Sequence, residues 1–130
     1  MAAAERYMKR LADVVRPLLV TNGGPILMLQ VENEYGSYGN DRAYMHRLRD
    51  VWVGAGIDVP FYTADGATPA DLEAGHLESA AVGLNPGSEE SHWELARKVV
   101  PGLPVLSAET YRGGSRTGAS VGRGRSSTTC

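Results

Sequence analysis

Cysteine is nearly absent from this 130-residue sequence, in which Cys130 is the only one. One cysteine cannot form a disulfide within the chain or build a cysteine-ligated metal site. The sequence also lacks Asn-x-Ser/Thr sequons for N-glycosylation. Neither feature therefore indicates a cellular compartment, and the sequence leaves the localisation unknown.

Long hydrophobic runs are also lacking. None approaches the ~20 apolar residues that a membrane-spanning helix requires, and the first residues mix charges with apolar side chains, unlike a signal-peptide core. Neither Gly-x-Gly-x-x-Gly nor Gly-x-x-x-x-Gly-Lys-Ser/Thr follows a predicted strand. We therefore expect no membrane span and no dinucleotide or P-loop site.

Acidic residues are missing from one part of the chain. Residues 112–130 contain four arginines and no acid, whereas residues 1–111 contain all 15 acids. Glycine, serine and arginine in this mixture cannot build a core, so we predict a folded segment 1–111 and a disordered basic tail 112–130. A nucleic-acid-binding tail is the alternative, but no aromatic residues interleave with the few arginines, and we expect no nucleic-acid partner.

Helical and strand-like segments alternate along residues 1–111. The apolar runs predict strands over residues 25–33, 59–66, 77–87 and 103–110. The amphipathic segments predict helices over residues 3–16, from Asn40 or Asp41 to Gly54 or Gly56, over 70–74, and from a Ser88 cap to about Val100. This order implies an α/β fold with a parallel sheet, either open and doubly wound or a slice of a (β/α)8 barrel.

Polar residues follow every predicted strand: Glu32, Asn33 and Glu34, then Thr63 and Asp65, then Asn85, then Ser107 and Glu109. Polar groups at the carboxyl ends of strands are typical of barrel active sites. We therefore predict a partial (β/α)8 TIM barrel.

Periodicity assigns other side chains to the core or the surface. Tyr7, Leu11, Val14 and Leu18 are predicted to form the apolar face of the first helix, and Tyr44, Leu48, Trp52 and Ala55 that of the second. Trp52 and Trp93 are interpreted as core residues rather than sugar platforms. His46, His76 and His92 lack the spacing of metal ligands, so no metal site is predicted.

Glu34 and Glu109 are the candidate catalytic pair, because strand ends of a barrel converge on one face. Cleavage of a glycosidic bond needs one carboxyl group that donates a proton and a second, ionised one that attacks the sugar or stabilises its charge. Strand alternation directs Glu32 and Glu34 the same way, so geometry does not choose between them. Solvated loop acids or helix-capping charges are the non-catalytic alternative.

The stretch GGPILMLQVENEYGSYG, residues 23–39, resembles the signature of family 35 glycoside hydrolases, the β-galactosidase family. The resemblance implies that Glu34 is the general acid/base, that Asn33 contacts galactose and that Glu32 is a supporting acid. The later FYTADG and PVLSAETY segments are also similar to that family. They imply that Glu109 is the nucleophile and Tyr111 a sugar-contacting aromatic.

The resemblance implies a retaining β-galactosidase-like hydrolase that acts on terminal β-D-galactosyl residues without a cofactor. It places the chain at about strands four to seven of the barrel, and the oligomeric state stays unknown. Because such a slice exposes two sheet edges and an apolar face, we expect the isolated chain to be unstable or aggregated, with little activity. The alternative is a non-catalytic truncated pseudo-enzyme or sugar-binding remnant.

The tail departs from the family, in which a sequence like Gly-Trp-x-x-His-Trp-Gly would follow the nucleophile. Codons that can encode residues 112–120, regrouped after one added base, can also encode Trp, His and Trp at that spacing. We hypothesise that residues 112–130 are an out-of-frame translation, which the coding DNA tests.

Overall fold

Helices and strands alternate along the computed structural model of the chain, which describes residues 2–110. The helices are α1 (Ala2–Val15), α2 (Arg42–Gly54), α3 (Pro69–Gly75) and α4 (Glu90–Val99), with short 3-10 turns η1 (Arg16–Leu18), η2 (Val20–Asn22) and η3 (Tyr35–Ser37). The strands are β1 (Leu29–Gln30), β2 (Phe61–Gly66), β3 (Ala81–Asn85) and β4 (Val105–Ser107). The predicted tail 112–130 lies outside the described residues.

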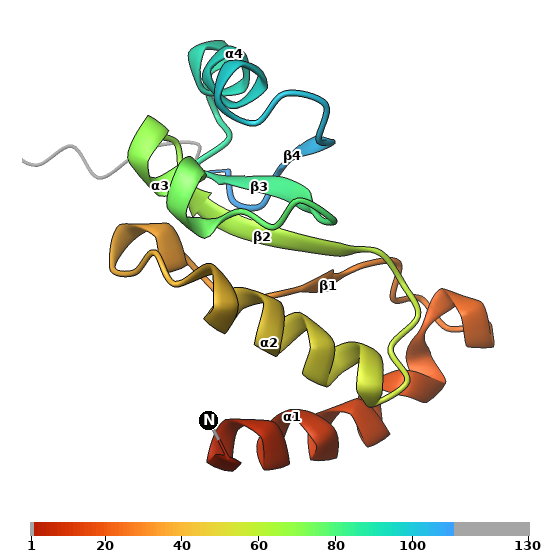
Figure 1. Ribbon diagram of the computed structural model, residues 1–130. Helices are drawn as coiled ribbons and strands as arrows, with labels where there is room; N and C mark the ends of the chain where they lie inside the picture. The colour runs from red at the N-terminus through yellow and green to blue at the C-terminus, as the bar shows by residue number, and fades with distance from the viewer. Residues whose placement is uncertain (1, 111–130) are drawn as a thin grey trace, which may run out of the picture.

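The four strands form one sheet in the order β1-β2-β3-β4. Each neighbouring pair is parallel, with Leu29 opposite Phe61, Tyr62 opposite Ala81 and Val82 opposite Val105. Parallel neighbours need a crossover connection, and α2, α3 and α4 supply one between each pair (Figure 1). The predicted α/β fold with a parallel sheet is therefore confirmed.

Capping residues explain where the helices begin. The Asp41 side chain accepts a hydrogen bond from the Tyr44 amide at the start of α2, and Thr68 does the same for Asp71 at the start of α3. The prediction that Ser88 caps α4 is wrong, since the capping position is Glu89 and its side chain makes no capping bond.

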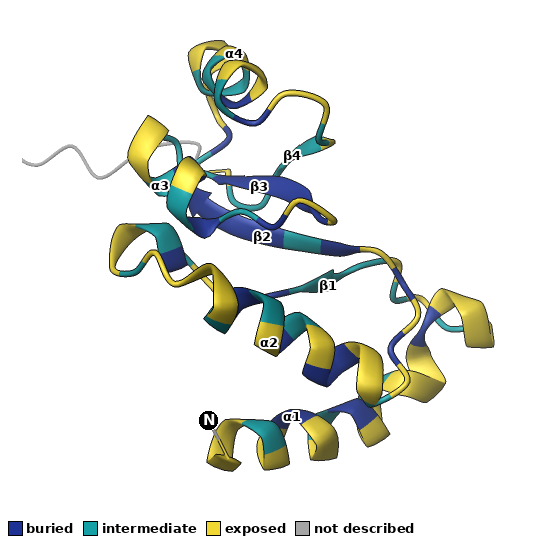
Figure 2. Ribbon diagram, viewed as in Figure 1, coloured by how far each residue is buried: buried dark blue, intermediate teal, exposed yellow. Residues whose placement is uncertain are grey.

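Two apolar clusters hold the sheet to its helices. The first joins α1 and α2 to the chain around β1 and β2, and the second joins α3 and α4 to β3 and β4. Trp52 is buried in the first and Trp93 packs against the second, as expected for core residues. The buried positions lie along β2, β3 and the inner faces of the helices (Figure 2).

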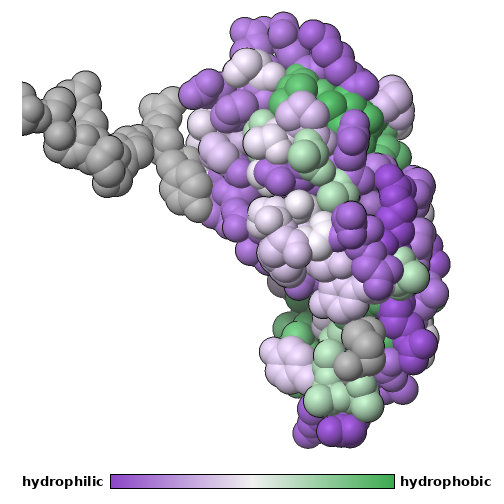
Figure 3. Space-filling model, turned by 60° about the vertical axis from the view of Figure 1, so that its left-hand side comes forward, coloured by the Kyte–Doolittle hydropathy of each residue, from purple (hydrophilic) through white to green (hydrophobic). Residues whose placement is uncertain are grey.

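The predicted inner face of α1 is wrong in part. Met8 and Ala12 are buried and Leu11 packs partly buried against the same cluster, whereas Tyr7 is 67% and Val14 60% exposed. The apolar residues of α1 make two overlapping stripes, and α1 packs against its neighbours through the Met8–Ala12 stripe. Figure 3 shows apolar surface at the level of α1 and again at the level of α4 and β4.

The strand predicted over residues 25–33 is also wrong in extent, because only Leu29–Gln30 pair as a strand with β2. Before it, Ile26 forms a separate parallel bridge with Leu19. After it, Glu32 and Glu34 have φ angles of 65° and 56°, which lie in the left-handed region. Extended backbone cannot continue through such residues, so the acids sit on a bent segment rather than on a strand.

Candidate active site

The carboxyl ends of the parallel strands bring the predicted site residues to one edge of the sheet. The segment that follows β1 carries Glu32, Asn33 and Glu34, and β3 ends at Asn85. Glu109 follows β4 by two residues. Tyr111, the predicted sugar-contacting aromatic, lies outside the described residues.

Glu34 is held by β2 and by the end of β3. Its amide donates to the Ala64 carbonyl of β2 at 2.7 Å, and its carbonyl accepts from the Ser37 amide and hydroxyl. Its carboxyl Oε1 accepts a hydrogen bond from Asn85 Nδ2 at 2.5 Å. The backbone is therefore set by β2, while the side chain reaches the end of β3.

Glu109 meets the same end of β3 through its backbone. The amides of Ala108 and Glu109 donate to the Leu84 carbonyl at 3.0 and 3.3 Å, and the Glu109 carbonyl accepts from the Gly87 amide at 2.9 Å. The Ser107 hydroxyl donates to the same carbonyl. Two glutamates that are 75 positions apart in sequence are thus both anchored within residues 84–87.

Glu32 and Asn33 form a small hydrogen-bonded group with two residues that the sequence did not single out for it. Glu32 Oε2 accepts from the Asn33 amide at 2.7 Å and from the Tyr38 hydroxyl at 2.6 Å. The hydrogen bond to Glu32 raises the pKa of Tyr38, so the phenol stays a donor. Gln30 Nε2 donates to Asn33 Oδ1 and to the Glu32 carbonyl, which fixes the Asn33 amide.

Asp65 differs from the other strand-end acids because it is buried, with only 1% of its surface exposed. Burial raises its pKa, and the neighbouring charges of Asp71 and Glu32 raise it further. The hydrogen bond that its Oδ1 accepts from the Gly36 amide at 3.0 Å opposes this shift. The sequence marked Asp65 as a polar strand end but could not show that it points into the protein.

Replacing Asp65 by asparagine should remove a pH dependence of stability. Because the pKa of Asp65 is raised on folding, the folded chain binds this proton more tightly than the unfolded chain. That contribution is fully present below the ordinary pKa of 3.8 and is lost as pH rises through the folded pKa. Urea unfolding should therefore show Asp65→Asn gaining stability relative to the native chain as the pH rises above 3.8.

Val82→Ala is the control for this measurement, since Val82 is fully buried on the neighbouring strand β3 and does not titrate. Its stability should follow the pH dependence of the native chain. A constant difference between Asp65→Asn and the native chain at every pH would contradict a raised pKa.

Each of the three histidines lies close to a main-chain carbonyl or to an acidic side chain of the protein. His76 Nδ1 bonds with the Leu72 carbonyl at 2.8 Å, His46 lies 3.4 Å from Glu78, and His92 lies 3.9 Å from Glu89. Between residues 2 and 110, no group of three or more His, Cys, Asp or Glu residues is placed to hold a metal ion.

None of the helices in the same range is long and apolar enough to cross a membrane.

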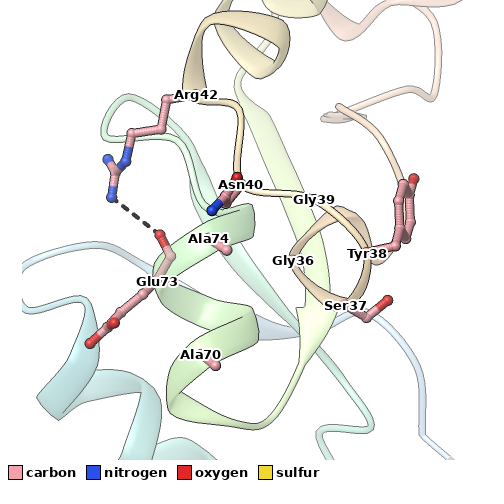
Figure 4. Close-up of a pocket in the computed structure, with 9 residues that line it drawn as sticks. All are labelled: Gly36, Ser37, Tyr38, Gly39, Asn40, Arg42, Ala70, Glu73 and Ala74. Atoms are coloured by element: carbon pink, nitrogen blue, oxygen red, sulfur yellow. Dashed lines mark hydrogen bonds between the residues drawn. The ribbon is translucent and has the colours of Figure 1, made fainter.

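A groove of about 760 Å³ lies between the Gly36–Asn40 segment and α3 (Figure 4). Its lining residues combine glycine and alanine with polar residues, among them Tyr38, Asn40 and Arg42. Arg42 also donates to the Glu73 carbonyl across one end, at 3.1 Å. Neither Glu34 nor Glu109 is among its lining residues, so the groove does not contain these two glutamates.

A parallel α/β sheet that presents two glutamates at the end of one strand has the composition of a carboxylate-pair hydrolase site. The chain belongs to glycosyl hydrolases family 35, whose sequence model matches residues 1–119. This finding agrees with the resemblance carried by the Gly23–Gly39 signature.

Named relatives in plants, bacteria and mammals share this stretch of sequence. The chain is 43% identical over 117 residues to Beta-galactosidase 17 of Arabidopsis thaliana, covering 84% of this chain and 17% of that protein. It is 42% identical over 116 residues to a Beta-galactosidase of Xanthomonas manihotis, covering 87% of this chain and 19% of that protein. Against the Beta-galactosidase of Canis lupus familiaris it is 37% identical over 118 residues, covering 87% of this chain and 18% of that protein. The chain thus spans less than a fifth of the length of these relatives.

Proposed function

We propose that this chain carries the catalytic carboxylates of a retaining β-galactosidase-like glycoside hydrolase acting on terminal β-D-galactosyl residues. The observation that carries the proposal is the convergence of Glu34 and Glu109 on the end of β3. The choice of galactose as the proposed sugar comes from the names of the family 35 relatives, which are β-galactosidases. The sheet is proposed to correspond to about strands four to seven of a (β/α)8 barrel.

The reaction would proceed in two steps. The Glu109 carboxylate attacks the anomeric carbon, while Glu34 gives its proton to the leaving glycosidic oxygen, and a covalent galactosyl ester forms. Glu34, now a carboxylate, then takes a proton from water, whose oxygen attacks the same carbon and releases Glu109. Two inversions return galactose with its original anomeric configuration.

The neighbours of Glu34 have separate proposed roles. Asn85 donates to Oε1, which leaves the other carboxyl oxygen to carry the transferred proton. Asn33 would contact the galactose, with its amide oriented by Gln30, and Tyr111 would provide a second contact. Glu32 would support this group through Tyr38 and the Asn33 amide rather than transfer protons.

The test is hydrolysis of 4-nitrophenyl β-D-galactoside by the purified 130-residue chain, beside the β-D-glucoside as a matched substrate. The expected result is a low rate of nitrophenol release, as for an isolated slice of a barrel, but with preference for the galactoside over the glucoside and with β-galactose as the first product in a proton NMR time course. First release of α-galactose would contradict the retaining mechanism. Galactose binding without hydrolysis would instead favour a sugar-binding remnant.

A further inference from the structure

Strand β2 holds the segment that carries Glu34 at three successive places. The Val31 amide donates to the Tyr62 carbonyl at 2.8 Å, and the Glu34 amide donates to the Ala64 carbonyl at 2.7 Å. The third bond differs in kind, because the Gly36 amide donates to the side chain of Asp65 rather than to backbone. The third hydrogen bond between β2 and this segment therefore depends on the carboxylate of Asp65.

The Asp65 carboxylate is enclosed by the segment on one side and by α3 on the other. A Cβ atom added at Gly75, the last residue of α3, would lie 1.9 Å from Asp65 Oδ1. A Cβ atom added at Gly36 would lie 2.0 Å from the Asp71 carbonyl oxygen. Two glycines thus let the segment, the carboxylate and α3 pack in direct contact, and Figure 4 shows the segment beside α3.

Holding one amide with a buried carboxylate lowers the stability of the folded chain, because burial disfavours the charge of the carboxylate. The neighbouring acids Asp71 and Glu32 add to that cost rather than relieve it. A carboxylate does, however, accept a hydrogen bond more strongly than a neutral group does. The segment it holds contains Glu34 in a left-handed conformation, which a residue with a side chain adopts only where surrounding contacts maintain it.

We propose that Asp65 is a positioning residue, whose buried carboxylate holds the Gly36 amide and thereby keeps the Glu34 backbone in the conformation that directs its carboxyl to Asn85. Asp65 itself does not reach the substrate, because it lies on the helix-facing side of the sheet. The inference about structure stands on the contacts of Asp65. Its consequence for catalysis rests on the proposed function of Glu34.

Two substitutions should release the segment from opposite sides. Asp65→Ala removes the acceptor of the Gly36 amide, and Gly75→Ala leaves the acceptor but forces the carboxylate to move. Alanine ordinarily stabilises a helix relative to glycine, so a loss in Gly75→Ala would trace to the displaced carboxylate. Asp65→Asn retains an acceptor oxygen, and Asp71→Asn changes a neighbouring acid without touching the hydrogen bond to Gly36.

Amide hydrogen exchange of the 130-residue chain measures the release directly. In Asp65→Ala and Gly75→Ala, the Gly36 and Glu34 amides should exchange at least about tenfold faster than in the native chain, the loss expected for a hydrogen bond to a charged group. The Val82 amide, which donates to Pro104 between β3 and β4, is the internal reference and should change less. In Asp65→Asn and Asp71→Asn, the exchange rate of the Gly36 amide should stay within a few-fold of its rate in the native chain.

Equal acceleration of the Gly36 and Val82 amides in both releasing variants would overturn the proposal, since it would indicate general destabilisation. Unchanged exchange at Gly36 would overturn it as well. Hydrolysis of nitrophenyl galactoside gives the second readout: Asp65→Ala should lower kcat with little change in KM, and Asp65→Asn should restore it. A chain that hydrolyses no galactoside but shows the exchange pattern would refute the proposed function and leave the positioning role of Asp65 supported.

Discussion

Replacing Glu34 by glutamine should lower kcat/KM for nitrophenyl β-galactoside by about 10²- to 10⁴-fold, the usual contribution of a general acid/base. Glutamine has the same shape and can still accept the hydrogen bond from Asn85, so the fold of the segment should remain. What it cannot do is protonate the leaving oxygen. The loss should therefore be greatest for substrates with basic leaving groups and smallest for dinitrophenyl galactoside, whose leaving group departs without a proton.

Glu32→Gln is the matched control, because Glu32 lies two residues away and also has a left-handed backbone. Its loss of activity should be smaller and should not depend on the leaving group. If Glu32→Gln showed the leaving-group dependence and Glu34→Gln did not, the roles of the two glutamates would have to be exchanged.

Replacing Glu109 by glutamine should abolish turnover of every galactoside, whatever its leaving group, with a loss of about 10³-fold or more. The physical reason is that the covalent galactosyl ester cannot form without a carboxylate nucleophile. Glu109 is anchored through its backbone to Leu84 and Gly87, so the substitution should leave the strand end in place. Circular dichroism of the variant should match that of the native chain.

Covalent labelling separates the nucleophile from the acid. A 2-deoxy-2-fluoro-galactoside with an activated leaving group slows breakdown of the ester, so mass spectrometry should find the sugar attached to Glu109. Glu109→Gln should remain unlabelled, and Glu90→Gln, an exposed acid at the start of α4, should label like the native chain. Attachment to another carboxylate would contradict the assignment.

The parts of the structure that local chemistry decides were predictable from the sequence. Asp41 caps α2 as one of the two residues expected there, and the alternation of elements led correctly to a parallel sheet. Parallel strands place their carboxyl ends together, which is why Glu34 and Glu109 could be paired before any geometry was known. The roles proposed for them came from the resemblance to the family signature, because strand alternation could not separate Glu32 from Glu34.

The parts that depend on packing partners were not predictable. The two apolar stripes of α1 are similar in sequence, and only contact with neighbouring elements selects Met8 over Tyr7. The extent of β1 depends on backbone angles at Glu32 and Glu34 that hydrophobic patterning does not record. Asp65 resembled the other strand-end acids because the sequence does not show which side of β2 faces α3.

The left-handed backbone of Glu32 and Glu34 has a consequence for how this chain can be altered. Strain of roughly 1–3 kcal/mol per residue is expected at such positions, and glycine would relieve it. Glycine at either position should therefore make the segment more stable, but it would remove a carboxyl group that has a proposed role in the site. Engineering for heat resistance should leave this segment unchanged and concentrate on the exposed apolar residues of α1.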